Sequence, residues 1–329
     1  MNRILSATVE RWPVAGAFII SRGAKTEVDV VVCTVGDGVR VGRGEGTAIY
    51  YEGETAEACA AAIRGYGGPL DRDALLQHMP RGAARNALDC ALWDLEAQQA
   101  GAPVWELAGL PRPEPLATAF TISLGEPDRM QADARAAALR GFGLLKCKLT
   151  GEGDGARIAA VRAGAPDVRL IVDANESWHE RDIVAEARAL AKLGVEMVEQ
   201  PILHEREERL AGVRSPLPLC ADESCHSRAD LDRLGDFDAI NIKLDKAGGL
   251  TEALALARAG RERGFRIMVG CMLGTSLGIA PAALVAQGAD WIDLDGALLL
   301  ARDREGGLVM ERGFLYPGML WGTGRPPAQ

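Results

Sequence analysis

Long hydrophobic runs, an excess of basic side chains and paired cysteines are all absent from this sequence of 329 residues. No stretch of about 18 uncharged apolar residues occurs, so we expect no membrane-spanning helix. The first segment meets charge at Glu10 and Arg11 before any apolar core typical of a signal peptide develops. The formal net charge of −9 argues against nucleic acid as a partner. We therefore expect neither a membrane nor a nucleic acid among the binding partners.

The arrangement of cysteine and histidine also excludes some functions. The seven cysteines form no C-x-x-C pair, and their odd number argues against a disulfide framework. Free thiols are typical of a reducing compartment, so we expect a cytoplasmic protein. Cys220 and Cys225 have no partner at zinc-finger spacing, and we expect both to be small buried side chains. The four histidines show neither triad nor ligand spacing, which predicts structural or surface roles for them.

The composition that remains is ordinary for a soluble globular enzyme, with 48% apolar and 25% charged residues. Residues 1–50 alternate as antiparallel strands do, and Gly-Asp-Gly at 36–38 predicts a hairpin. Gly42, Gly44 and Gly46 do not continue as G-x-G-x-x-G, because position 47 is threonine, and we expect a turn there.

Two predicted helices, at 54–66 and 82–100, and a proline-rich boundary at 111–115 complete the first part of the chain. After this boundary, short apolar runs alternate with stretches that can each hold a helix. Such alternation predicts βαβ units and a parallel sheet, and eight units favour a closed (β/α)8-type barrel. The eight runs are 117–123, 143–148, 169–173, 195–199, 217–222, 238–243, 266–270 and 291–295.

Charged residues stand where most of these runs end. A parallel barrel brings the carboxyl ends of all its strands to one face, where such enzymes hold their active sites. One lysine at a strand end is often a side chain whose charge reaches solvent, and one aspartate there is often a helix cap. Many such ends in succession instead predict one shared site. Its members are Lys146, Lys148, Asp173, Glu199, Asp222, Lys243, Asp293 and Asp295.

The residue types in this set favour one kind of chemistry. Three carboxylates, Asp173, Glu199 and Asp222, form an all-oxygen ligand set that suits Mg²⁺, with Mn²⁺ as an alternative hard ion. Lysines on both sides of such a metal can remove the α-proton of a bound carboxylate and return it to either face. We expect Lys148 to be a base. Its neighbour Lys146 is expected to hold the developing negative charge and to depress the pKa of Lys148.

The pattern resembles the enolase superfamily, and within it the muconate-lactonizing subgroup. The resemblance rests on K-x-K at 146–148, on the three acidic strand ends and on Lys243 as the second base. It implies an α/β fold, a (β/α)7β modified TIM barrel with an α+β N-terminal capping domain. The capping domain would span residues 1–115, completed by about 300–329, and the barrel would span 116–299.

Three stretches are similar to dipeptide epimerases of the L-Ala-D/L-Glu type: FIISRGAKTE at 18–27, ADESCHSR with NIKLDKAGGLTEAL, and DLDG. This likeness implies a 1,1-proton transfer at the C-terminal residue of a dipeptide, in the recycling of cell-wall peptides. Asp293 and Asp295 would bind the free α-ammonium of the dipeptide. Arg22 would bind the substrate glutamate side chain, although a solvated loop charge is an alternative for this residue.

Some assignments stay open. Asn175 and Glu223 are predicted to support the ligands from outside, with a helix cap as the alternative for Glu223. Lys246 is expected to be a loop charge. Rivals with the same chemistry are o-succinylbenzoate synthase, N-acylamino acid racemase and muconate cycloisomerase. A Schiff-base aldolase or isomerase and a non-catalytic binding barrel are rivals of other kinds. The sequence does not specify an oligomer, and a homo-oligomer is left open.

Overall fold

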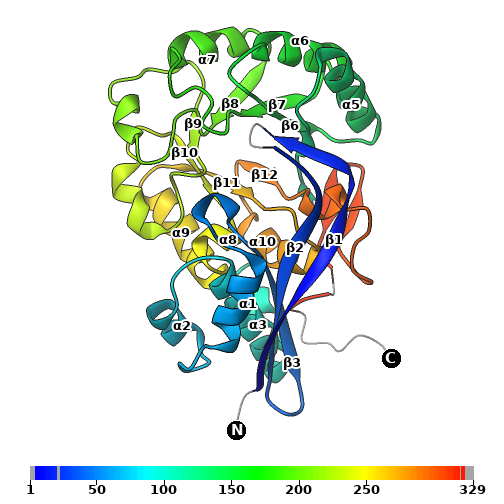
Figure 1. The fold of residues 1–329 in the computed structure, drawn as a ribbon, viewed down its shortest axis with the longest axis vertical. Coiled ribbons are helices and arrows are strands. Elements are labelled where there is room, and N and C mark those ends of the chain that lie inside the picture. Colours follow the sequence, from blue (N-terminus) through cyan, green and yellow to red (C-terminus); the bar gives the residue numbers. More distant parts are fainter. Residues whose placement is uncertain (1–3, 21–22, 319, 323–329) are drawn as a thin grey trace.

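The computed structural model describes residues 4–20, 23–318 and 320–322 (Figure 1). The chain begins with a three-stranded antiparallel sheet made of β1 (Ile4–Ile20), β2 (Gly23–Gly36) and β3 (Val41–Thr47). The helices that follow it are η1 (Tyr50–Glu52), α1 (Ala56–Arg64), α2 (Arg72–His78), α3 (Ala83–Ala100) and α4 (Val104–Leu107). The predicted hairpin and the two predicted helices in this part are thus confirmed.

The turn predicted at Gly42, Gly44 and Gly46 is wrong, because all three residues lie within β3. Helix α3 packs directly on this face of the sheet. A Cβ atom on Gly44 would lie only 2.1 Å from the carbonyl oxygen of Ala87, and Gly42 would meet Ala91 equally closely. Glycine at every second strand position therefore lets the backbone of the helix approach the backbone of the strand.

The second part of the chain is a sheet of eight parallel strands that runs in sequence order from β5 to β12. The backbone amide of Ala119 donates to the carbonyl of Ile292 over 2.7 Å, which joins the first and last strands. The expected modified barrel is therefore confirmed. Its strands are β5 (Phe120–Ile122), β6 (Leu144–Lys148), β7 (Arg169–Asp173), β8 (Val195–Glu199), β9 (Leu219–Ala221), β10 (Ala239–Ile242), β11 (Arg266–Gly270) and β12 (Trp291–Asp293).

The helices between the strands differ from expectation at two places. The connections from β8 to β9 and from β9 to β10 hold only short 3-10 helices. In the first of these connections, Pro201 and Gly212 stand on either side of the stretch that holds η2 (Glu207–Leu210) and limit the length of any helix there. The connecting helices are α5 (Pro127–Leu139), α6 (Asp154–Gly164), α7 (Ile183–Ala191), η2 (Glu207–Leu210), η3 (Arg228–Arg233), α8 (Leu244–Ala247), α9 (Leu250–Glu262) and α10 (Ser276–Val285), with η4 (Gly296–Leu299) after β12.

The segment after the barrel returns to the first part of the chain. β13 (Val309–Glu311) and β14 (Phe314–Tyr316) form a small sheet with β4 (Leu116–Ala117). The indole nitrogen of Trp321 then donates to the carbonyl of Cys90 over 3.1 Å, within α3. These contacts support the domain division at residues 115 and 300, which stays a prediction.

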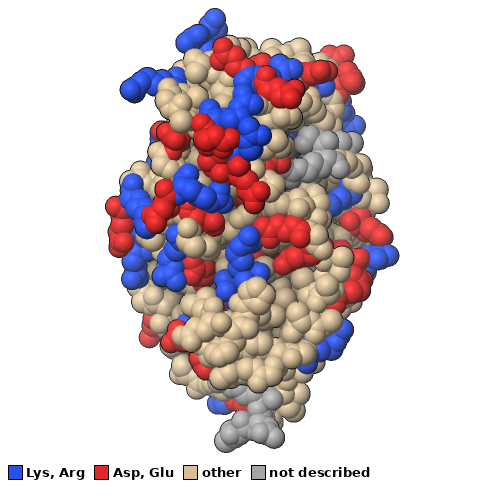
Figure 2. All heavy atoms as spheres, turned by 60° about the vertical axis from the view of Figure 1, so that its left-hand side comes forward, with Lys and Arg blue, Asp and Glu red and all other residues tan. Residues whose placement is uncertain are grey.

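On the face shown in Figure 2, lysine and arginine side chains are interspersed with aspartate and glutamate and form no continuous basic patch. Among the described residues, no helix combines the length and the apolar character that crossing a bilayer requires.

Candidate active site

The interior of the barrel is built in layers, because alternate residues of each strand point inward. The lowest described layer is an apolar ring of one buried side chain per strand: Ala119, Leu144, Ile171, Met197, Cys220, Ala239, Met268 and Trp291. Two positions further along each strand the character changes to polar. The residues there are Thr121, Lys146, Asp173, Glu199, Asp222, Asn241, Gly270 and Asp293. The period of two that defines the strands therefore also places the charged residues together.

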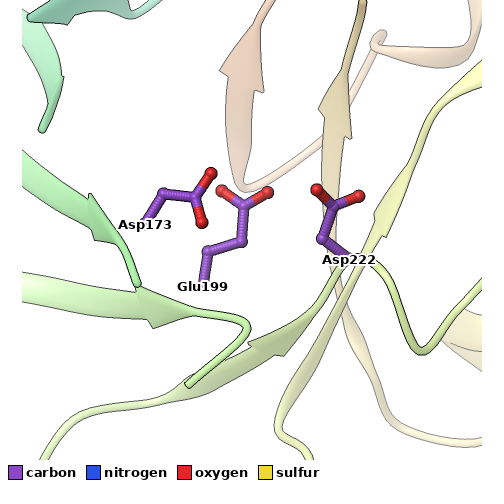
Figure 3. Close-up of side chains that lie close together, drawn as sticks. All are labelled: Asp173, Glu199 and Asp222. Atoms are coloured by element: carbon purple, nitrogen blue, oxygen red, sulfur yellow. The ribbon is translucent and has the colours of Figure 1, made fainter. Parts of the chain in front are cut away.

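Asp173, Glu199 and Asp222 meet at the carboxyl ends of neighbouring strands (Figure 3). Each offers one carboxylate oxygen, and these oxygens lie within 4.8 Å of one another, fully buried. Asn241 donates to Oε1 of Glu199 over 2.7 Å, while Oε2 of Glu199 accepts no well-angled hydrogen bond. An all-oxygen set of this size can hold a hard divalent cation.

The electrostatics of the cluster fit such an ion. Burial, together with the neighbouring Asp173 carboxylate, raises the pKa of Glu199 to about 8. Burial alone would raise the pKa of Asp173, but Lys148 and Lys146 lower it to about 2. Burial would lower the pKa of Lys146, yet Asp293 and the other carboxylates raise it well above its ordinary range. At Glu199 the lysines do not offset burial and the neighbouring carboxylates, and a divalent cation would supply the missing positive charge.

Lysines flank the carboxylates from two sides. Nζ of Lys148 donates to Oδ2 of Asp173 over 2.7 Å, and Nζ of Lys243 donates to Oδ2 of Asp222 over the same 2.7 Å. Lys146 lies deeper and contacts Glu199 at 2.6 Å. Lys148 and Lys243 both line a pocket at the carboxyl ends of the barrel strands, so the structure brings the two predicted bases to one cavity.

The acidic pair after the last strand lines the same pocket. Oδ2 of Asp293 accepts from Lys146 over 2.9 Å, and Oδ2 of Asp295 accepts from the backbone amide of Thr121 over 2.7 Å. Burial and the neighbouring Asp293 raise the pKa of Asp295 to about 7. This end of the cavity is therefore suited to a cation.

The two residues predicted to support the ligands also lie in the pocket. The backbone of Asn175 has a left-handed conformation, with φ of 42°, and its amide donates to Oδ1 of Asp173 over 2.9 Å. Its side-chain amide donates to Oε1 of Glu223 over 3.4 Å. Asn175 thus orients Asp173. Arg22 lies outside the described residues.

The expectation that Lys246 is a loop charge is wrong. Lys246 belongs to α8 and its side chain is completely buried, with Nζ 2.6 Å from Oδ1 of Asp222. The same nitrogen donates to the carbonyls of Cys225 over 2.8 Å and Asn241 over 3.0 Å. The error arose because Lys246 follows Lys243 by three residues, a spacing that reaches the site only through a helical turn.

Other contributors to the site were not singled out from the sequence. Asn241 precedes Lys243 by two residues, so strand alternation was a usable signal for it. A Cβ atom on Gly270 would lie 3.2 Å from Cε of Lys243, and glycine there makes room for the lysine. Gln200 joins two strand ends, because its Oε1 accepts from the backbone amide of Asp222 over 2.9 Å.

The first part of the chain closes the pocket from above. Phe18, Lys25, Tyr50 and Tyr51 line the cavity together with the barrel residues. The ammonium of Lys25 lies over the ring of Tyr50, 4.3 Å from its centre. Burial lowers the pKa of Lys25. Within the described ranges no carboxylate pairs with this lysine, so the cap presents a half-buried positive charge to the cavity.

Comparison with known families agrees with this architecture. Residues 129–317 match the family described as enolase C-terminal domain-like. Residues 4–109 match the N-terminal domain of mandelate racemase and muconate lactonizing enzyme. The chain therefore belongs to the enolase superfamily, and the suspected resemblance is confirmed.

Within the enolase superfamily, the chain is similar to several dipeptide epimerases. The chain is 42% identical to L-Ala-D/L-Glu epimerase of Escherichia coli over 95% of this chain and 99% of that protein. Its structure is similar, with a TM-score of 0.92 and 49% identity, to an enolase family member from Agrobacterium tumefaciens with homology to dipeptide epimerases. That structure holds sodium and L-Ala-L-Glu, and the match covers 98% of this chain and 100% of that one. A dipeptide epimerase from Enterococcus faecalis, complexed with Mg and L-Leu-L-Tyr, gives a TM-score of 0.88 at 30% identity, covering 97% of this chain and 98% of that one.

Proposed function

We propose that this protein is a Mg²⁺-dependent dipeptide epimerase, an isomerase that inverts the α-carbon of the C-terminal residue, with L-Ala-D/L-Glu as its substrate. The observation that carries the proposal is the pair Lys148 and Lys243, which reach one pocket from opposite sides of three clustered carboxylates. Inversion needs one group to take a proton and another to supply one on the opposite face. The similarity to L-Ala-D/L-Glu epimerase of Escherichia coli supports the same activity.

The metal would be held by Asp173, Glu199 and Asp222. When bound, Mg²⁺ would supply positive charge to the substrate carboxylate, which makes the neighbouring α-proton more acidic. The buried ammonium of Lys146 lies among these ligands, 2.6 Å from Glu199 and 3.4 Å from Asp173. Lys146 is placed to stabilise the negative charge that would develop on the substrate carboxylate.

The proton transfer is performed by the two outer lysines. Lys148 or Lys243 removes the α-proton, and the lysine on the opposite side donates a proton to the other face. The reaction of the opposite epimer uses the same two residues in exchanged roles. Asn241 and Gly270 serve this arrangement, since the first orients Glu199 and the second leaves space for Lys243.

Charges at the ends of the pocket support an acidic dipeptide. Asp293 and Asp295 line one end and would bind the free α-ammonium, which N-acylated amino acids lack. Lys25 lines the cap side, where its ammonium would bind the side-chain carboxylate of a C-terminal glutamate. The seven free cysteines support a reducing compartment, and we place the enzyme in the cytoplasm.

A library of dipeptides incubated with the enzyme in D₂O tests this proposal. Mass spectrometry reports incorporation of deuterium, and chiral chromatography reports inversion. We expect both with L-Ala-L-Glu and L-Ala-D-Glu, and neither with N-acetylated dipeptides. Incorporation restricted to N-acylated amino acids, or absent from every dipeptide in the presence of Mg²⁺, would refute the proposed activity.

A further inference from the structure

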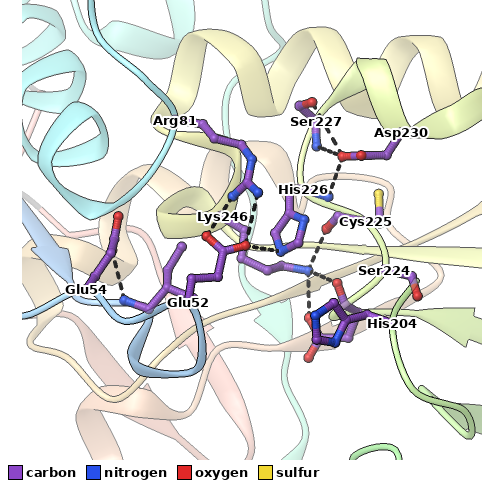
Figure 4. Close-up of polar contacts among 12 residues, drawn as sticks. Glu52, Glu54, Arg81, His204, Ser224, Cys225, His226, Ser227, Asp230 and Lys246 are labelled. Atoms are coloured by element: carbon purple, nitrogen blue, oxygen red, sulfur yellow. Dashed lines mark hydrogen bonds and ion pairs between the residues drawn. The ribbon is translucent and has the colours of Figure 1, made fainter. Parts of the chain in front are cut away.

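Lys246 is a buried ammonium whose donors are all used inside the protein. It is absent from the lining of the pocket, and its side chain is fully enclosed. Nζ donates to the backbone carbonyls of Asp222, Cys225 and Asn241. Figure 4 shows the side chain of Lys246 reaching toward Cys225. Burying an ammonium is costly, so the contacts that it makes must outweigh the loss of its hydration.

Lys246 also contacts one side chain, the carboxylate of Asp222. Oδ1 of Asp222 lies 2.6 Å from Nζ of Lys246, and Oδ2 of the same carboxylate accepts from Lys243 over 2.7 Å. The backbone amide of Asp222 donates to Gln200 over 2.9 Å. The carboxylate is therefore held between two lysines, only one of which faces the pocket. Lys246 opposes the pull of Lys243 and keeps Asp222 directed toward Asp173 and Glu199.

We infer that Lys246 is a positioning residue that fixes Asp222 for metal binding and holds the loop of residues 222–226 in place. The inference rests on the proposed function, because it takes Asp222 to be a ligand of the metal. Lys246 itself touches neither the pocket nor the other two carboxylates of the cluster. Its effect reaches the site through Asp222 and through the backbone of the loop.

The same loop carries a contact to the capping region. Nε2 of His226 lies 3.0 Å from Oε1 of Glu52, and Glu52 also accepts from Arg81 over 2.9 Å (Figure 4). Tyr50 and Tyr51, which precede Glu52 in η1, line the pocket. Lys246 binds the carbonyl of Cys225 and therefore holds residues 222–226 in place. This loop connects Asp222, a candidate metal ligand, to η1, which lines the pocket.

Two variants, Lys246→Met and Lys246→Gln, test the inference. The first removes charge and donors, whereas the second keeps hydrogen-bond donors without the charge. Lys192→Met, at an exposed lysine after α7, is the matched control. Mg²⁺ binding to each full-length protein is measured by isothermal titration calorimetry without substrate, and the KM for Mg²⁺ and kcat are measured with L-Ala-L-Glu.

We expect both Lys246 variants to bind Mg²⁺ roughly 10-fold to 100-fold more weakly than the wild type, as is typical of residues behind metal ligands. The KM for Mg²⁺ should rise by a similar factor, with a smaller change in kcat at saturating Mg²⁺. The control should match the wild type. Folded variants with wild-type Mg²⁺ affinity would overturn the inference. Failure of both variants to fold would also overturn it, since Lys246 would then have a structural role.

The experiment separates this inference from the proposed function. If the wild type inverts no dipeptide, the proposed activity fails, but the calorimetric comparison still decides the role of Lys246. If the wild type inverts L-Ala-L-Glu and the variants bind Mg²⁺ normally, only the inference fails.

Discussion

The carboxylate cluster has a pair of lysines on each of two sides, and the two pairs are held by different parts of the barrel. On the side of β6, Lys148 contacts Asp173 and the deeper Lys146 stands behind it; on the side of β10, Lys243 contacts Asp222 with Lys246 behind it. The outer lysines are each 8% exposed, and the inner ones are 1% and 0% exposed. Each side thus offers one accessible amine supported by one enclosed ammonium.

The difference lies in what the inner lysines touch. Lys146 contacts three carboxylates, those of Asp173, Glu199 and Asp293, and all its ion pairs lie in the site. Lys246 contacts a single carboxylate, and its donors go to backbone carbonyls. The inner lysine on the β6 side is therefore placed to act on charge in the site, whereas the one on the β10 side is placed to hold the loop that carries the candidate ligand Asp222.

The sharpest test of the comparison replaces the outer lysines one at a time. Lys148→Ala and Lys243→Ala should each lower the rate of epimerisation by roughly 10²-fold to 10⁴-fold, the usual contribution of a general acid or base. Each variant should retain exchange of the α-proton with one epimer in D₂O, and the retained epimer should differ between the two. Proton NMR of L-Ala-L-Glu and L-Ala-D-Glu measures both effects. Equal turnover in both variants at the wild-type level would contradict the two-base arrangement.

A smaller effect is expected at the acidic end of the pocket, where Asp295 contacts β5. Asp295→Asn weakens the charge-assisted contact to the α-ammonium, which is worth about 1.5–3 kcal/mol. We expect kcat/KM for L-Ala-L-Glu to fall by roughly 10-fold or more, with a smaller change for N-acetylated glutamate. Asp167→Asn, at an exposed aspartate, is the control. A larger loss for the N-acylated substrate than for the dipeptide would exclude the ammonium site.

The smallest effect is expected at Lys25, on the wall contributed by the cap. Lys25→Met removes a half-buried charge but preserves the contact of the aliphatic chain with Tyr50. The ratio of kcat/KM for L-Ala-L-Glu to that for L-Ala-L-Met should fall by roughly 10-fold, because only the acidic substrate loses an ion pair. Competition assays with both dipeptides measure this ratio directly. An unchanged ratio would remove Lys25 from substrate recognition.

The sequence was sufficient for the charged residues at the strand ends, although it did not single out Asn241 in β10 or Gly270 in β11. Lys146 and Lys148 share one side of β6 because side chains alternate along a strand. The strand ends at Asp173, Glu199 and Asp222 follow one another at intervals of one βα unit. Lys246 could not be found in this way, since it reaches Asp222 from the first turn of a helix. Its three-residue spacing from Lys243 has no meaning until the local backbone is known.

Two features of the fold, the glycines of β3 and the connections around β9, could not be predicted from sequence patterns. Gly42 and Gly44 have the composition of a turn, and only the packing of α3 shows that they make room for a helix backbone. The connections on either side of β9 are long enough for helices, yet they hold only the short 3-10 helices η2 and η3. For the glycines, tertiary contacts rather than local preference decide the structure.

The apolar ring beneath the charged layer has a consequence for how this enzyme can change. Its eight members form a buried apolar cluster, while the residues two positions further along most strands carry the charged groups of the candidate site. Substitutions in the charged layer can therefore change the substrate while the apolar ring beneath it stays packed. The same strands therefore carry one layer of residues that stabilises the barrel and a second layer that determines its chemistry.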